Sequence, residues 1–587
     1  MKISHIKIQN YRNIQDIDLD FSQVTIIAGE NNSGKSNLLR AITLPFISEE
    51  GGYNGKSLTW MDINNDAKDE YYEYLLKNKE DIIEGRISDE DFLKILPVVT
   101  VEVQFFPEVQ ERFWVKDLSC NIINDEIIYS IKYEFRPKKV RDILDSVKSI
   151  ISTEDIVENL NGIKLSLLPT DLYEYSIFVP GKGPISYDIL KQFRYMFLTA
   201  ERDDFSNSSH KIGSKALVKL LKMKIDEEDR LKVEKKYAEF FDTLKGLSGM
   251  ENILNWQNNS EIENAEDFFN NISVLPNMPP MTSILNSVRL GYNNENLSMQ
   301  GLGYRNMILL LVLINSLFEK SEEIPLRIIE IEEPEAHLCI NNIRLIVSFI
   351  KAFMKDNTRV QIICTTHSTE FLNKLDLSNI ILMNNGYGYS LQSVVSSAER
   401  DYLAKNPNMD LFKFFYSKRC ILVEGLTEEL LIRAYLDSRP LLSEIEVLSF
   451  HKGYKDIIKI WKKLNEGTDR KLGIVRDYDD QEKAKEEHEA LESAQVCVKT
   501  TSGYTLETDI VNAGKNYELL KNRYGDQLGW TSMTADELQK DWRGSKSYIM
   551  LQLCHDLRTG EISEFTMPKH IDTILKFMEE EKVTDEN

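Results

Sequence analysis

The chain has 587 residues, a hydrophobic content of 42% and a formal net charge of −23 at pH 7. Its length predicts about three or four domains, and its composition is that of an ordinary soluble globular protein. The negative charge argues against a generally basic coat for nucleic acid, but it leaves room for a local basic groove because metal-binding carboxylates also count as negative.

Membrane and secretory signals are not apparent in the sequence. No apolar run approaches the roughly 20 residues that cross a membrane, and the first residues lack the apolar core of a signal peptide. The six cysteines are scattered without the paired spacing of a metal site, which is typical of a reducing cytosol. We therefore expect a cytoplasmic protein that does not enter a membrane.

Residues 2–42 predict a strand pair followed by a strand, a loop and a helix. Residues 2–21 alternate apolar and polar side chains in two runs, as antiparallel strands do. Residues 24–28 are apolar and β-branched and predict a buried strand, whereas 37–42 predict a helix. Between them, Gly29–Ser36 has the pattern G-x-x-x-x-G-K-[ST], which in this context indicates a phosphate-binding loop.

The physical chemistry of this loop assigns roles to its residues. Glycines let backbone N–H groups turn toward phosphates, and the helix N-terminus adds its dipole. Lys35 would reach the β- and γ-phosphates of ATP, and the Ser36 hydroxyl would hold Mg²⁺. A glycine-rich turn before a helix is the weaker alternative. The residues predicted to bind nucleotide here are Gly29, Asn32, Gly34, Lys35, Ser36 and Asn37.

The middle of the chain predicts two insertions with strands between them. Residues 66–90 predict a charged helical surface segment, and 206–272 predict a second helical region with a basic start. Lysines on one face of this region form either a solvated helix face or a contact with the DNA backbone, and the sequence favours neither. No sustained heptad run follows, which argues against a long-armed chromosome-tethering protein. The lysines that share one helix face are Lys211, Lys215, Lys219 and Lys222.

A Ser/Gly loop precedes a very apolar helix at 307–318. A loop that leads into a helix N-terminus is a second place where an anion can bind. The residues predicted to contact nucleotide here are Ser298, Gly301 and Gly303.

An apolar strand at 326–331 delivers two adjacent acids, Glu332 and Glu333, into a turn. Strand side chains alternate between faces, so the two acids can have different roles. Glu332 would complete the Mg²⁺ shell. Glu333 would be the catalytic carboxylate of ATP hydrolysis, which polarises the attacking water. Two acids that merely cap a strand end are the weaker alternative, because a phosphate loop lies upstream.

The order of these motifs resembles the ABC-type ATPase heads of the RecF, Rad50 and SMC type. The resemblance implies that Arg12 lies near the nucleotide and that His367, in the T-T-H-S segment, senses the γ-phosphate. It also implies that the Ser/Gly loop completes the nucleotide site of a second subunit. The loop departs from the usual L-S-G-G-Q, and the first acid is Glu332 rather than Asp.

A second set of acids follows residue 419. One apolar strand ends on Glu424, a glycine turns the chain, and a helix opens with Glu428. A later strand, 472–476, ends in the D-x-D pair Asp477 and Asp479. Carboxylates at the C-terminal ends of neighbouring parallel strands converge on one crevice, where hard oxygen ligands gather Mg²⁺ or Mn²⁺.

This second set resembles the Toprim domain of topoisomerases, primases and OLD-family nucleases. Residues 504–510 resemble the L-E-x-D-[LI] segment of OLD-type Toprim domains, so Glu507 and Asp509 are implied to join the metal ligands. Lys546 lies in a segment that resembles their C-terminal lysine motif. It would neutralise charge on the scissile phosphate, although an ordinary surface lysine is equally consistent.

Together the motifs predict an α/β protein of the OLD (overcoming lysogenisation defect) family: a RecF/Rad50-like ABC ATPase head with a helical insertion, then a Rossmann-like Toprim domain. The head would occupy 1–205 and 286–400, the insertion, with a dimerisation role, 206–285, and the Toprim domain 415–587. The resemblance implies a metal-dependent DNA endonuclease that ATP regulates, in a homodimer or homotetramer joined through the heads.

The size and the lack of long coils suggest anti-phage nucleases of the Gabija type or the OLD-like retron type. The first would have a helicase partner, and the second a reverse transcriptase with its DNA product. The alternatives are a RecF-like repair ATPase and a sensor scaffold, in which the C-terminal domain binds rather than cuts. A topoisomerase would need an added DNA-gate domain, for which no segment is large enough.

Overall fold

The computed structural model describes residues 1–49, 56–123, 126–154, 156–200, 212–246, 268, 279–316, 324–355, 359–373, 376–394, 410–437, 444–450, 455–478 and 482–579. The chain divides into two compact units. The larger unit comprises Met1–Leu198, Ile324–Pro334 and Val347–Asn587, and the smaller one comprises Thr199–Glu323 and Glu335–Ile346.

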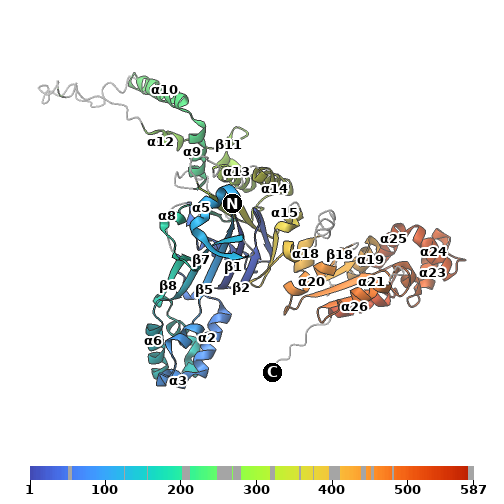
Figure 1. The fold of residues 1–587 in the computed structure, drawn as a ribbon. Coiled ribbons are helices and arrows are strands. Elements are labelled where there is room, and N and C mark those ends of the chain that lie inside the picture. The colour runs from blue at the N-terminus through green and yellow to red at the C-terminus, as the bar shows by residue number, and fades with distance from the viewer. Residues whose placement is uncertain are drawn as a thin grey trace, which may run out of the picture. The chain divides into compact units, whose positions relative to one another are not determined.

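The first sheet of the larger unit is antiparallel, and Figure 1 labels its strands β1, β2, β5, β7 and β8. Its strand order is β2-β1-β5-β7-β8-β9, with β6 paired to β7. Alternation along β1 buries Ile6 and Ile8 and leaves Lys7 half-buried, which confirms the predicted strand pair. The strands are β1 (Lys2–Tyr11), β2 (Ile14–Asp20), β5 (Val99–Phe106), β6 (Ser119–Ile123), β7 (Glu126–Pro137), β8 (Tyr173–Val179) and β9 (Gly183–Pro184).

The second sheet carries the nucleotide motifs and has the order β16-β15-β3-β14-β13-β10-β4. All its pairs are parallel except β15 with β16. The apolar sequences of β13 and β14 are buried almost throughout, as befits central parallel strands. The strands are β3 (Val24–Gly29), β4 (Ile47–Ser48), β10 (Phe193–Leu198), β13 (Leu326–Glu332), β14 (Val360–Thr366), β15 (Ile380–Asn384) and β16 (Tyr387–Ser390).

One hydrophobic core joins these two sheets through α1 (Lys35–Thr43), whose Leu38, Leu39 and Ile42 are fully buried in it. The first predicted insertion forms α2, α3 and α4, and α6 and α7 pack against these helices. The remaining helices of this part are α2 (Asn65–Lys77), α3 (Lys79–Glu84), α4 (Asp89–Ile95), α5 (Arg112–Val115), α6 (Val140–Thr153), α7 (Ile156–Leu167), α8 (Tyr187–Leu190), α15 (Thr369–Asn373) and α16 (Leu391–Val394). Short 3₁₀ turns are η1 (Trp60–Asp62), η2 (Val109–Glu111), η3 (Lys116–Leu118), η4 (Thr170–Leu172) and η7 (Leu377–Asn379).

The smaller unit is mainly helical in the part that the structure describes. Its apolar helix α13 (Leu302–Ser316) packs against α9 (Ile212–Lys224), and Asp226 caps the next helix by accepting a bond from the Asp229 N–H. Lys211 lies outside the described residues. The other elements are α10 (Glu227–Lys245), α12 (Met281–Leu285), β11 (Gly291–Tyr292), β12 (Glu295–Asn296), η6 (Leu297–Met299) and the start of α14 (Ile340–Lys355).

The C-terminal part of the larger unit contains a four-stranded parallel sheet in the order β18-β17-β19-β20. Its strands are β17 (Arg419–Val423), β18 (Ile445–Ser449), β19 (Lys471–Arg476) and β20 (Val496–Thr500). Its helices are α18 (Leu411–Tyr416), α19 (Leu426–Asp437), α20 (Lys455–Leu464), α21 (Glu482–Glu489), α22 (Leu506–Asn512), α23 (Asn516–Leu528), α24 (Ala535–Gly544), α25 (Lys546–Thr559) and α26 (Lys569–Glu579).

The alternation of parallel strands and helices confirms the predicted α/β class. The Toprim assignment and the four-part domain division stay predictions. Across the described ranges, no helix combines the length and the apolar character needed to cross a membrane.

Candidate functional site

Strand order gathers the ATPase motifs of the larger unit at one edge. β14 lies between β3 and β13, and parallel strands present their carboxyl ends at the same edge of a sheet. The phosphate loop after β3, the T-T-H-S segment after β14 and the acid pair at the end of β13 therefore share that edge.

The phosphate loop turns into α1 at Gly34, whose φ of 106° lies in the left-handed region. The Lys35 ammonium is buried and donates to the carbonyl oxygens of Gly29 at 2.8 Å and of Glu30 at 2.7 Å. The lysine thus spans the concave side of the loop, where phosphate oxygens would compete for its protons. Ser36, Asn32 and Asn37 lie on the same loop and the first turn of the helix.

Arg12 lies against the start of α1, and its place near the nucleotide stays a prediction. Its guanidinium donates to Asn37 Oδ1 at 3.1 Å and, through two nitrogens, to Asp62 Oδ1 at 3.0 and 2.9 Å. Asn37 in turn donates to Asn13 Oδ1 at 2.8 Å. Asp62 belongs to none of the predicted motifs. The sequence does contain a turn signal here, because Thr59 and Asp62, three residues apart, form a capping pair.

The acid pair and the histidine meet across neighbouring strands. Glu333 has a φ of 43°, and its N–H donates to the Thr365 carbonyl at 3.1 Å. His367 Nδ1 lies 3.4 Å from Glu333 Oε1. Glu332 on β13 pairs in register with Thr365 on β14. β14 in turn lies next to β3, the strand that leads into the phosphate loop.

Glu330 is a buried acid that motif reasoning missed. It is fully buried in β13, and neither carboxylate oxygen has a hydrogen-bond partner among the described residues. Burial raises its pKa well above the ordinary value, and the nearby charge of Glu332 raises it further. Glu330 and Glu332 are two residues apart, so they lie on the same face of the strand. That spacing was the one sign in the sequence that Glu330 belongs with the acid pair.

The Ser/Gly loop belongs to the smaller unit. Ser298 donates to Asn296 Oδ1 at 3.0 Å, both through its backbone N–H and through its hydroxyl. Gly303 approaches the chain so closely that an added Cβ would lie 2.5 Å from the His337 carbonyl oxygen. A Cβ at Gly301 would meet no described atom within 4 Å, so of the two glycines only Gly303 is required by packing.

The C-terminal sheet brings Glu424 and Asp477 together. They follow the neighbouring strands β17 and β19, and the Asp477 N–H donates to Glu424 Oε2 at 3.0 Å. Asp479 lies outside the described residues.

A second group lies where α19, α22 and α25 begin. Glu428 and Glu507 are 4% and 1% exposed, and Lys546 Nζ lies 3.2 Å from Glu507 Oε2. Burial raises the pKa of Glu428, and the charge of Glu507 adds to the effect. Lys546 therefore faces a buried acid instead of standing alone on the surface.

The Asp509 carboxylate already has partners within the chain. It accepts the backbone N–H groups of Ser502 at 2.7 Å and Gly503 at 2.6 Å, and His570 Nδ1 lies 3.0 Å from it. Burial would raise its pKa, but the bonds from His570 and the two amides outweigh burial and hold the pKa below its ordinary value. No pattern in the sequence pointed to His570.

These acids provide the ligand chemistry of a hard divalent cation. Glu428 and Glu507 place two carboxylates in a buried site with one lysine, and apart from the ion pair with Lys546 neither oxygen of Glu507 has a hydrogen-bond partner among the described residues. Such a site is stabilised by a cation. However, no three His, Cys, Asp or Glu side chains in the described ranges stand close enough together to hold a metal.

Comparisons with known proteins identify the family to which the chain belongs and the proteins it is similar to. The AAA ATPase domain family matches residues 1–372. Endonuclease GajA of Bacillus cereus (strain HuB5-5) is 22% identical over 486 residues, which cover 76% of this chain and 68% of that protein. Endonuclease GajA of Bacillus cereus (strain VD045) is 23% identical over 463 residues, with 74% and 68% covered.

The SMC head domain from Thermotoga maritima is similar at 14% identity with a TM-score of 0.27, covering 66% of this chain and 99% of that one. A structural similarity this weak identifies no relationship by itself. The family match spans more than half of the chain, and the GajA similarity spans about three quarters of it. The chain therefore belongs to the AAA ATPase domain family, and its relatives confirm the resemblance to OLD-family proteins of the Gabija type.

Proposed function

We propose that this protein is a nucleotide-regulated, divalent-metal-dependent DNA endonuclease of the OLD family that acts in bacterial anti-phage defence. The acids of the C-terminal sheet are the main support: Glu424 contacts Asp477, and buried Glu428 lies beside Glu507 and Lys546. Two relatives named Endonuclease GajA support the same activity.

In this proposal, Glu424, Glu428, Asp477, Asp479 and Glu507 hold one or two Mg²⁺ or Mn²⁺ ions. Asp509 acts mainly by fixing the loop at 502–503 through its two backbone bonds. The ions would lower the pKa of the attacking water and stabilise the leaving 3′-oxygen. Lys546 is placed to offset negative charge that develops on the scissile phosphate.

The ATPase residues have separate roles in the proposal. Lys35 and the loop amides bind the phosphates, Ser36 and Glu332 hold Mg²⁺, and Glu333 orients the attacking water next to His367. The 3.4 Å approach of His367 to Glu333 supports this assignment. Two heads would close on ATP in a homodimer or homotetramer. The helicase or reverse-transcriptase partner stays a prediction.

The test is the pair of variants Glu424→Gln and Asp477→Asn, assayed for cleavage of plasmid DNA and for Mn²⁺ affinity by calorimetry. Each should reduce cleavage at least about a hundredfold, the loss typical of removing one catalytic electrostatic group, and weaken Mn²⁺ binding with ATP affinity unchanged. Glu429→Gln is the matched control, since that acid pairs with Arg433 on the same helix. Wild-type cleavage by both variants would refute the proposal.

A binding-only C-terminal domain is the second candidate. Two of the expected ligands already have partners within the chain, which favours it: Asp509 is bonded to two backbone amides, and Glu507 pairs with Lys546. This candidate predicts tight DNA binding without Mg²⁺- or Mn²⁺-dependent cutting, and Glu424→Gln would then leave DNA affinity unchanged. A cleavage time course with both metals, next to a filter-binding measurement, separates the two candidates.

A further inference from the structure

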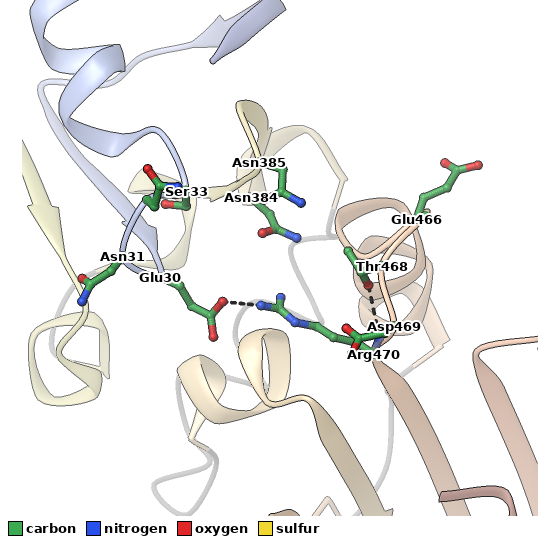
Figure 2. A pocket seen from close by; sticks show the side chains of 11 residues that line it. Glu30, Asn31, Ser33, Asn384, Asn385, Glu466, Thr468, Asp469 and Arg470 are labelled. Carbon is green, nitrogen blue, oxygen red and sulfur yellow. Dashed lines mark hydrogen bonds and ion pairs between the residues drawn. The ribbon is translucent and has the colours of Figure 1, made fainter. Parts of the chain in front are cut away.

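The phosphate loop is bordered by the C-terminal part of the larger unit. A pocket of about 430 Å³ is lined by the loop residues 30–33, the turn 384–385 and the segment 466–470 (Figure 2). Glu30 and Arg470 face each other across it and form an ion pair. No sequence motif contains Arg470, yet it is a cation in direct contact with the loop.

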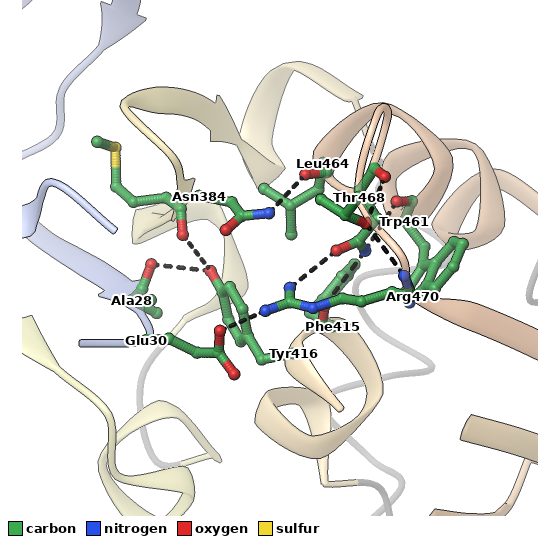
Figure 3. Close-up of polar contacts among 12 residues, drawn as sticks. Ala28, Glu30, Asn384, Phe415, Tyr416, Trp461, Leu464, Thr468 and Arg470 are labelled. Carbon is green, nitrogen blue, oxygen red and sulfur yellow. Dashed lines mark hydrogen bonds and ion pairs between the residues drawn. The ribbon is translucent and has the colours of Figure 1, made fainter. Parts of the chain in front are cut away.

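Arg470 is held in place on the C-terminal side. Its guanidinium donates to Asn465 Oδ1 at 2.8 Å and lies over the ring of Tyr416, 5.7 Å from the centroid (Figure 3). Asn465 is itself buried and donates to the carbonyls of Phe415 and Trp461. The side chain of Arg470 is only 11% exposed, so it is an organised element of this interface.

The base of the loop is fixed by the same interface. The buried Tyr416 hydroxyl lies 3.0 Å from the carbonyl oxygen of Ala28 and 3.1 Å from that of Met383 (Figure 3). Asn384 donates to the Leu464 carbonyl at 2.9 Å. The strand end that carries the phosphate loop is therefore bonded directly to α18, and the neighbouring strand β15 is bonded to α20.

Glu30 is held from two directions. Its carboxylate pairs with Arg470, whereas its backbone carbonyl accepts a bond from Lys35. Phosphates that attract the Lys35 ammonium would remove the second bond and free the loop to change its course. Glu30 thus joins the bond from Lys35, at its backbone carbonyl, to the contact with Arg470, at its carboxylate.

Arg470 immediately precedes β19, and that strand ends next to Asp477. β19 is bonded to β17 on one side and to β20 on the other, so its two ends are rigidly connected. The path from Arg470 to Asp477 is about seven residues, or about 23 Å of extended strand. One end touches the phosphate loop, and the other contacts Glu424.

We propose that Arg470 is a positioning residue that couples the two sites: its pair with Glu30 sets the position of β19, and with it Asp477, according to whether nucleotide occupies the phosphate loop. This rests on the proposed function for the role of Asp477. Coupling between two sites is reciprocal, so the state of Arg470 must also change nucleotide affinity.

The experiment uses the full-length protein with and without a non-hydrolysable ATP analogue. Hydrogen exchange of backbone amides in 466–478 should change on nucleotide binding in the wild type, and Arg470→Gln should abolish that change. Analogue affinity should shift about fivefold or more in this variant. Lys418→Gln is the control, because Lys418 pairs at 3.7 Å with Asp469, the residue before Arg470, without a side-chain bond to the described residues of the phosphate loop, and it should behave as wild type.

A charge reversal provides a rescue. Glu30→Arg and Arg470→Glu should each lose the exchange response, and the double variant should regain part of it. A wild type that binds the analogue without any change in 466–478, or an Arg470→Gln variant that keeps the change, would overturn the coupling. Failure of the wild type to cut DNA would overturn the nuclease proposal and leave this readout intact.

Discussion

Asp62 lies outside every motif of the sequence, yet it holds Arg12 against the start of α1 by accepting two bonds from the guanidinium. Burial would raise the pKa of Asp62, but hydrogen bonds from Thr59 and Arg12 outweigh burial and hold the pKa below its ordinary value. A carboxyl with a lowered folded-state pKa stabilises the fold above its unfolded pKa of about 3.9. That contribution is lost as the pH falls through the folded-state pKa.

At the residue scale, Asp62→Asn should therefore lower the melting temperature by a constant amount between about pH 5 and pH 8, and by less as the pH approaches about 3. ATP affinity should fall about tenfold, since a charge-assisted bond contributes about 1.5–3 kcal/mol and Arg12 loses its orientation. Thermal melts across pH and a fluorescent-nucleotide titration measure both. Asp66→Asn, which changes an exposed acid in the first turn of α2, should leave ATP affinity unchanged.

The turn between β17 and α19 shows how an element positions the acids. An added Cβ at Gly425 would lie 2.8 Å from Glu428 Oε2, and Glu428 is too buried to move aside into solvent. The absence of a side chain at Gly425 lets the first turn of α19 bring this carboxylate beside Glu507. The strand–glycine–helix order of the sequence indicated the turn, and the structure shows the close approach that requires glycine.

At the element scale, Gly425→Ala should displace the Glu428 carboxylate and weaken both Mn²⁺ binding and DNA cleavage about tenfold or more, with ATP affinity unchanged. Calorimetry with Mn²⁺ is the measurement. Gly162→Ala is the control: a Cβ at that position would have no described atom within 4 Å, and alanine favours a helix by up to about 1 kcal/mol. Equal Mn²⁺ affinity in both variants would contradict the prediction.

The larger unit combines an ATPase sheet and a C-terminal parallel sheet. The proposed behaviour of the whole molecule is that of a switch, in which heads close on ATP and the closed state changes the acids near Asp477. Ser298 and Gly303 belong to the separate compact unit, and the action of this loop on a second subunit stays a prediction.

At the scale of the molecule, Glu333→Gln should bind ATP without hydrolysing it and should shift the protein to a larger assembly in sedimentation velocity with ATP. The added Lys35→Ala change removes nucleotide binding and should return the variant to its ATP-free state. Sedimentation that is identical with and without ATP would remove the head-closure proposal, although ATP binding would stand.

The phosphate loop, the acid pair and the α/β class could be predicted from the amino-acid sequence alone, because they depend on local spacing and on periodicity within one strand or helix. The predicted strands at 2–21 and the helices of 66–90 follow the same rule. Chain order also indicated which acids would share an edge, because parallel strands align their carboxyl ends.

Which residues from distant parts of the chain meet became visible only in the folded protein. There Asp62 lies against Arg12, His570 against Asp509 and Arg470 against Glu30. There too, Asp509 is bonded to backbone amides, and Glu330 is buried without a hydrogen-bond partner among the described residues. These contacts arise from packing across long sequence separations, where no local spacing, propensity or periodicity records the partner.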